Sequence, residues 1–261
     1  MEPTAETTAP LQNQLRQWGR LLTQSLWSLV SFIVALGLSW HGLASVDFAY
    51  PIWHDHAGIA QTIAQYGPLN HYKPGLADTT FAVRYDLFAQ IVTAIHQQGQ
   101  DLQQLAYTHQ GQTIALLRPP EVRHLQAVAA LVDQADRLWL QSIGLWFGLT
   151  VFLLWQRWLP TRRQAWWWLM ALLGLLLVPL AWMGFEPLFY ALHEQFFAPG
   201  HPWFFYYEDS LMTTLMQAPD LFAWIGATLL VVAVVVFTGL TQGFDHLQSQ
   251  LVDKRPPLMT P

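Results

Sequence analysis

The residues of this chain best suited to chemistry lie in the stretch 193–210, which reads HEQFFAPGHPWFFYYEDS. Titratable and aromatic side chains alternate there between two strongly apolar segments, which makes the stretch a candidate site at a membrane surface. A further histidine, His124, precedes another apolar segment. Imidazole has an ordinary pKa of about 6.5, so His124 and His193 could accept and donate protons near neutral pH.

The composition defines the class of protein that must position these histidines. Hydrophobic residues make up 53% of the 261 residues and charged residues only 11%, which is typical of a polytopic membrane protein. The sequence contains no cysteine, which excludes disulfides, thiol nucleophiles and cysteine-ligated metals. The net charge of −5 gives no indication of a nucleic-acid partner.

Four windows are long and apolar enough to cross about 30 Å of hydrocarbon as helices. We therefore predict an all-α membrane protein with four transmembrane helices and a mostly helical extracytoplasmic loop domain. The first window follows two arginines and exceeds a signal-peptide core in length, which favours an uncleaved anchor. The predicted segments are an N-terminal tail (1–21), spans at 22–44, 138–158, 166–185 and 221–240, outer loops at 45–137 and 186–220, a turn at 159–165 and a C-terminal tail (241–261).

Basic residues predict the orientation, because positive charges in short loops stay in the cytoplasm. They cluster before the first span, between the second and third spans, and after the fourth, namely Arg16, Arg20, Arg157, Arg162, Arg163, Lys254 and Arg255. All three clusters fall on one side of a four-helix topology, so both termini are predicted to be cytoplasmic. The two outer loops hold 13 of the 17 acidic residues. His124 and His193 then face the same extracytoplasmic compartment.

The first outer loop is too long for a structureless connection and is predicted to be helical. Asp78 is a plausible N-cap for a helix with apolar residues spaced at three and four, from Phe81 to Ile95. The stretch 107–113 could form a small hairpin. Pro119-Pro120-Glu121 is a strong helix start, which places His124 in the first turn or two of a helix leading into the second span.

The run from His193 to Phe222 resembles the signature of the bacterial lipoprotein intramolecular transacylases, the Lit family. The matching positions are His193, the Phe196-Phe197 pair, Gly200 to Phe205, Asp209 to Leu211, Pro219 and Phe222. The four-span layout with a large first outer loop also matches. Members of this family carry a His-Met-x-Asp-Val-Lys run before the second span. Here the corresponding stretch 124–129 reads HLQAVA, which keeps the histidine and replaces the acid and the base with alanines.

The resemblance implies an acyltransferase of the bacterial inner membrane that needs no cofactor. It would move an acyl chain from the diacylglyceryl group of a lipoprotein's N-terminal cysteine to the cysteine amine, giving a lyso-form lipoprotein. His124 and His193 would be catalytic, one as general base and the other as its orienting partner or as acid. The residues expected to contact substrate, place its headgroup or hold an imidazole tautomer are Arg123, Phe196, Trp203, Tyr207 and Asp209.

Several alternatives remain open from the sequence. Histidine at a membrane interface is often only an amphipathic residue with its tip in water, and Phe204 to Tyr207 could be an interfacial anchor. Asp209 could be the N-cap of a short helix from Ser210 to Met216. His54-Asp55-His56 supplies at most part of a metal site, and we predict no metal. Rival functions are a haem cytochrome, which lacks facing histidines within the spans, an acyltransferase or hydrolase acting on another lipid, and a non-catalytic assembly partner.

Overall fold

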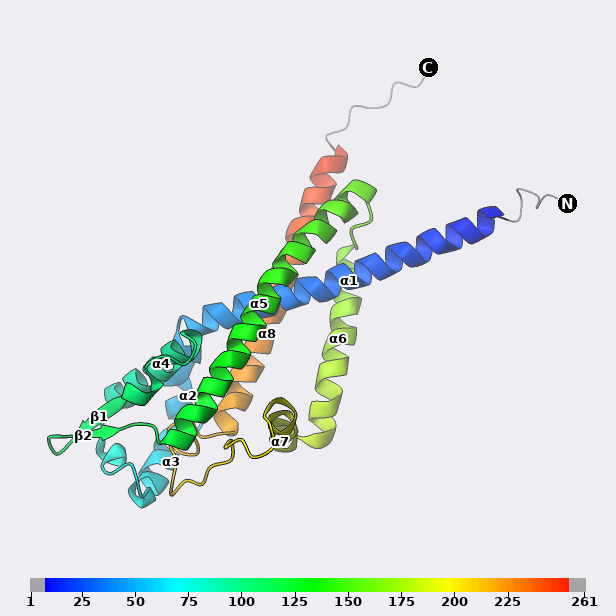
Figure 1. Ribbon diagram of the computed structural model, residues 1–261. Helices are drawn as coiled ribbons and strands as arrows, with labels where there is room; N and C mark the ends of the chain where they lie inside the picture. The colour runs from blue at the N-terminus through cyan, green and yellow to red at the C-terminus, as the bar shows by residue number, and fades with distance from the viewer. Residues whose placement is uncertain (1–7, 254–261) are drawn as a thin grey trace. The chain divides into compact units, whose positions relative to one another are not determined.

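The computed structural model describes residues 8–253 (Figure 1). Residues 1–7 and 254–261, which include parts of both predicted tails and the basic pair at 254–255, lie outside the described residues. The described residues are predominantly helical and contain two short strands, so the predicted all-α class is confirmed. The helices are α1 (Thr8–Ala44), α2 (Tyr50–His56), α3 (Ile59–Tyr66), α4 (Phe81–His96), α5 (Pro119–Gln156), α6 (Arg162–Met183), α7 (Phe185–Phe196) and α8 (Asp220–Asp253).

Within the described residues, four helices are long and apolar enough to cross a membrane, as predicted. The candidate spans are Gln12–Ala44, Pro119–Gln156, Arg162–Met183 and Asp220–Phe244. The second is a single helix of 38 residues, or about 57 Å at 1.5 Å per residue, almost twice the thickness of the hydrocarbon layer. Its apolar half starts at Leu138, directly after Asp133, Asp136 and Arg137. The part of α5 that carries His124 therefore lies outside the segment that crosses the hydrocarbon.

The chain divides into two compact units, and the first contains 1–38, 139–177 and 231–261. Its helices are joined by hydrogen bonds between polar side chains, which stabilise helix packing where lipid supplies no hydrophobic driving force. The indole of Trp27, which is fully buried, donates to Thr150 Oγ1 at 2.8 Å. Trp146 Nε1 donates to Ser31 Oγ at 2.8 Å, again between α1 and α5.

The second unit contains 39–138 and 178–230, and both predicted outer loops, 45–137 and 186–220, lie entirely within it. Its apolar core includes the buried stripe of α4, with Phe88, Ile91 and Val92 among its members, as the spacing predicts. The predicted hairpin is also present, because β1 (Ala106–His109) pairs antiparallel with β2 (Gln112–Ala115). Tyr50 of α2 stacks on Phe88 at a centroid distance of 4.0 Å, and its hydroxyl donates to the Leu215 carbonyl at 2.9 Å.

Two local expectations in the second unit are wrong. The N-cap of α4 is Thr80, whose hydroxyl accepts from the amide of Val83, whereas Asp78 ends a 3₁₀ turn over Leu76–Asp78. The stretch Ser210–Met216 forms turns and no helix. The buried carboxylate of Glu121 on α5 accepts from the Ser210 hydroxyl and the Leu211 amide, and these contacts hold the segment in a non-helical path.

Candidate functional site

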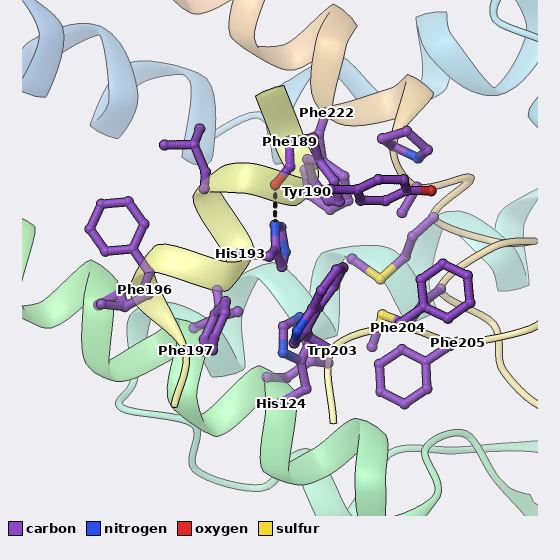
Figure 2. Close-up of a pocket in the computed structure, with 18 of the residues that line it drawn as sticks. His124, Phe189, Tyr190, His193, Phe196, Phe197, Trp203, Phe204, Phe205 and Phe222 are labelled. Atoms are coloured by element: carbon purple, nitrogen blue, oxygen red, sulfur yellow. Dashed lines mark hydrogen bonds between the residues drawn. The ribbon is translucent and has the colours of Figure 1, made fainter. Parts of the chain in front are cut away.

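The site is a cavity of about 360 Å³ within the second unit, and both His124 and His193 line it (Figure 2). This volume lies in the range of about 300–1,000 Å³ that is usual for small-molecule sites. The two imidazoles, from α5 and α7, have ring centroids 5.8 Å apart. Most other lining residues are aromatic or aliphatic, among them Trp40, Val128, Leu131, Phe189, Phe205, Met216 and Phe222. The cavity can therefore accept an apolar chain beside two proton-transfer groups.

His124 reaches the cavity because α5 starts at the predicted Pro119-Pro120 pair and turns the sixth residue of the helix inward. Its side chain is 7% exposed. Burial, together with the nearby His193 and His201, lowers the pKa of His124 to about 4, and burial is the largest of these causes. The imidazole of His124 is consequently neutral at neutral pH.

His193 lies in the last turn of α7, and its Nδ1 is 2.8 Å from the backbone carbonyl of Phe189 (Figure 2). A carbonyl oxygen can only accept, so Nδ1 carries the proton and Nε2 keeps its lone pair. Burial lowers the pKa of His193, while the hydrogen bond to Phe189 opposes that shift. The neutral ring therefore presents a proton acceptor, as a general base requires.

Aromatic rings enclose the two histidines. Phe189 lies 4.1 Å from His193 and Trp203 lies 5.2 Å from it, both measured between ring centroids. Phe197 contacts His193 at 5.4 Å and His124 at 5.0 Å. Among the residues singled out from the sequence, Trp203 and Phe196 line the cavity with the two histidines.

The other three residues singled out from the sequence lie elsewhere. Tyr207 packs against Tyr66 at 4.7 Å, and Asp209 Oδ1 lies 3.3 Å from Nδ1 of His71. Arg123 is exposed on α5, next to the inward-facing His124. None of the three is among the described residues that line the cavity.

Sequence reasoning missed a buried ion pair one turn before His124. Glu121 and Lys73 are 0% and 1% exposed, and Lys73 Nζ lies 3.6 Å from Glu121 Oε2. The same carboxylate accepts from the Arg118 amide at 2.7 Å and from the Ser210 hydroxyl at 2.6 Å. This network ties the segment before α8, which carries Met212 of the cavity wall, to the start of α5. No local pattern around Lys73 marks it as buried.

Sequence reasoning also left out His201 as a site residue, although it stands in the motif between His193 and Trp203. Its ring lies 5.7 Å from that of His124 and stacks on Phe197 at 5.0 Å with an angle of 10°. His201 follows His193 by eight positions, in the loop directly after α7, and this closeness was the available signal.

His54-Asp55-His56 lies outside the cavity lining. His54 is buried, its Nδ1 lies 2.8 Å from Asp55 Oδ1, and its ring packs on Phe81 at 4.9 Å. Across residues 8–253, no group of three or more His, Asp or Glu side chains is arranged to hold a metal ion.

Four candidate membrane-spanning helices and a histidine-bearing apolar cavity define a membrane protein with a site suited to a lipid chain. Residues 88–222 match the model of the family described as lipoprotein intramolecular transacylase Lit. This match covers more than half of the chain and every lining residue of the cavity except Trp40, and the chain belongs to this family. Membership supports lipoprotein transacylase activity in general. No curated protein and no solved structure matches the chain.

Proposed function

We propose that this protein transfers an acyl chain within a diacylated lipoprotein, from the diacylglyceryl group of the N-terminal cysteine to the amine of that cysteine. The product would be a lyso-form lipoprotein with an N-acyl chain. The observation that carries the proposal is the meeting of His124 and His193, with ring centroids 5.8 Å apart, on an apolar cavity. The reaction needs a proton acceptor, a proton donor and a place for a hydrocarbon chain, and this cavity offers all three.

We assign the general base to His193. The neutral amine attacks the ester carbonyl, and the Nε2 lone pair of His193 would take one proton from that nitrogen as the new nitrogen–carbon bond forms. The bond from the carbonyl carbon to the glycerol oxygen then breaks, and the imidazolium returns the proton to that oxygen. No proton, electron or co-reactant is gained or lost. His124 would be the second imidazole, facing the developing charge on the carbonyl oxygen.

Aromatic and aliphatic side chains of the cavity would hold the migrating acyl chain. Val128 and Leu131 follow His124 along α5, while Phe189 and Phe222 supply rings from α7 and α8. Phe196 and Trp203, both singled out from the sequence, would contact the substrate there. Arg123 is exposed and could meet a lipid phosphate next to the cavity. Tyr207 and Asp209 would act on the site only by fixing the loop before α8.

We propose that the site faces the extracytoplasmic side of the inner membrane. His124 precedes the end of α5 by 32 residues, or about 48 Å along the helix, and Arg157 follows that end. This length exceeds the hydrocarbon thickness, so His124 and Arg157 belong to opposite sides. Arg157, Arg162 and Arg163 favour the cytoplasm for the turn between α5 and α6, and with four spans both termini would then be cytoplasmic as well.

The experiment is mass spectrometry of the N-terminal peptide of a diacylated lipoprotein co-expressed with this protein. Wild-type protein is expected to shift one acyl chain from glycerol to the cysteine amine. His193→Ala and His124→Ala, expressed at equal levels, are expected to abolish the shift. His56→Ala is the matched control, since His56 is exposed and outside the cavity lining.

Two results would contradict this proposal. A lyso peptide with a free amine would indicate a hydrolase, which releases the chain to water. Diacyl peptide left unchanged by the wild-type protein would indicate another lipid substrate or a non-catalytic assembly role. One observation favours these alternatives. Ala127 and Ala129 replace the acid and the base of the family motif, and Ala129 is fully buried.

A further inference from the structure

His201 is the third imidazole near the cavity, and its ring lies next to that of His124. The loop between α7 and α8 carries it, and its half-buried ring stacks on Phe197. His124 lines the cavity, whereas His201 is not among the described residues that do so. The ring centroids of the two histidines are nevertheless only 5.7 Å apart. His201 is thus placed to act on His124 without touching the acyl chain.

One nitrogen of each ring is buried without a hydrogen-bond partner in the described part of the chain. These atoms are Nδ1 of His124 and Nε2 of His201. Buried polar atoms in folded proteins are nearly always paired, so two unpaired nitrogens on adjacent rings are unusual. A neutral imidazole has one donor and one acceptor nitrogen, which makes these two atoms complementary. The centroid distance of 5.7 Å is short enough for a hydrogen bond between the two rings, either direct or through one water molecule.

We propose that His201 is a positioning residue, whose Nε2–H donates to Nδ1 of His124 and thereby fixes the Nε2–H of His124 toward the cavity. The inference rests on the proposed function and assigns His124 its part in it. His193 presents a lone pair, because its Nδ1–H is held by the Phe189 carbonyl. His124 would present an N–H to the carbonyl oxygen of the ester. One imidazole then accepts a proton while the other stabilises the oxyanion, and neither has to change tautomer during the reaction.

The burial of His124 is consistent with its role as the N–H donor while His193 accepts the proton. The lowered pKa of His124 keeps the ring neutral, and a neutral ring donates only from the nitrogen that carries the proton. Without a partner on Nδ1, the proton of His124 could occupy either nitrogen. A donor on Nδ1 selects the Nε2–H tautomer, which is the useful one here.

The test uses purified full-length protein in detergent and two substitutions of His201. His201→Phe keeps a ring over Phe197 and removes the nitrogen, whereas His201→Gln keeps an amide donor. We expect His201→Phe to lower kcat about 100-fold with KM nearly unchanged, and His201→Gln to recover most of the loss. His56→Phe is the matched control at an exposed histidine and is expected to retain full activity.

A second readout does not depend on substrate. In ¹⁵N-histidine NMR spectra, the wild-type protein is expected to show His124 protonated at Nε2, and His201→Phe is expected to shift His124 toward a mixture of tautomers. An unchanged His124 signal in His201→Phe, or a kcat within threefold of wild type, would overturn the inference. If the wild-type protein fails to transacylate, the proposed function fails, and the NMR spectra alone decide the role of His201.

Discussion

Removing the ammonium of Lys73 should destabilise the second unit more than any surface substitution. Lys73 Nζ lies 3.6 Å from Glu121 Oε2, and both side chains are almost fully buried. At an effective dielectric constant of about 20, the attraction between two such charges is roughly 5 kcal/mol. Burial lowers the pKa of Lys73, and the neighbouring Glu121 opposes that shift. The pair therefore persists because each charge compensates the other.

Lys73→Met leaves the Glu121 carboxylate with its donors from Ser210, Leu211 and Arg118 but without its fully buried cation, so that only the partly exposed Arg118 guanidinium, 3.8 Å away, still compensates it. Breaking a buried pair by removing one partner costs about 3–5 kcal/mol, so this loss is expected in the free energy of unfolding. Glu121→Gln should cost a similar amount, because Lys73 then stays buried and unpaired. The double variant carries no lone buried charge, and its loss should fall short of the sum by about 2 kcal/mol or more.

The assay is unfolding in mixed detergent micelles, followed by far-UV circular dichroism. Arg137→Met is the matched control, since Arg137 is 68% exposed in its pair with Asp133 and such pairs contribute about 0–1 kcal/mol. Single variants that lose less than 1 kcal/mol, or a double variant whose loss equals the sum, would refute the reasoning.

Three further predictions concern the cavity and the helix packing. Because the pKa of His124 falls from an ordinary 6.5 to about 4 on folding, roughly 3 kcal/mol of stability is present above pH 6.5 and is lost as pH falls toward 4. Measuring the free energy of unfolding against pH checks this. His124→Phe should remove this contribution and leave the smaller one of the same sign from His193, whose pKa burial also lowers. Val128→Trp should reduce the cavity and select against long acyl chains, as mass spectra of the products would show; an unchanged chain-length profile would contradict acyl binding there. Gly37→Ala places a methyl group into the ring of Trp139 and should lower the free energy of unfolding by about 1–3 kcal/mol. Gly19→Ala on the same helix meets no neighbour and should be neutral or slightly stabilising. Thermal unfolding of both variants distinguishes the two cases.

Local pattern was sufficient for most of the helices. The apolar stripe of α4, the hairpin after it and the start of α5 at Pro119 all follow from spacing and from residues with strong local preferences. Local signals failed where a distant group competed. The segment from Ser210 forms turns in place of a helix because Glu121, far away in sequence, binds it. The N-cap of α4 is a separate case, in which Thr80, two residues after Asp78, supplies the capping hydroxyl.

The sequence by itself determined that this is a membrane protein with four apolar helices, and that His124 stands near the start of one of them. Long apolar runs and proline at a helix start act within a few residues, so they can be read along the chain. Only the tertiary structure decided that His124 and His193 meet at one cavity, that His201 lies beside His124, and that Lys73 pairs with Glu121. Those partners are far apart in sequence, except His193 and His201, and their meeting depends on how the side chains of α5, α7 and the loops pack. Such packing depends on how side chains from distant parts of the chain fit together in three dimensions, and the periodicity of the sequence does not contain this information.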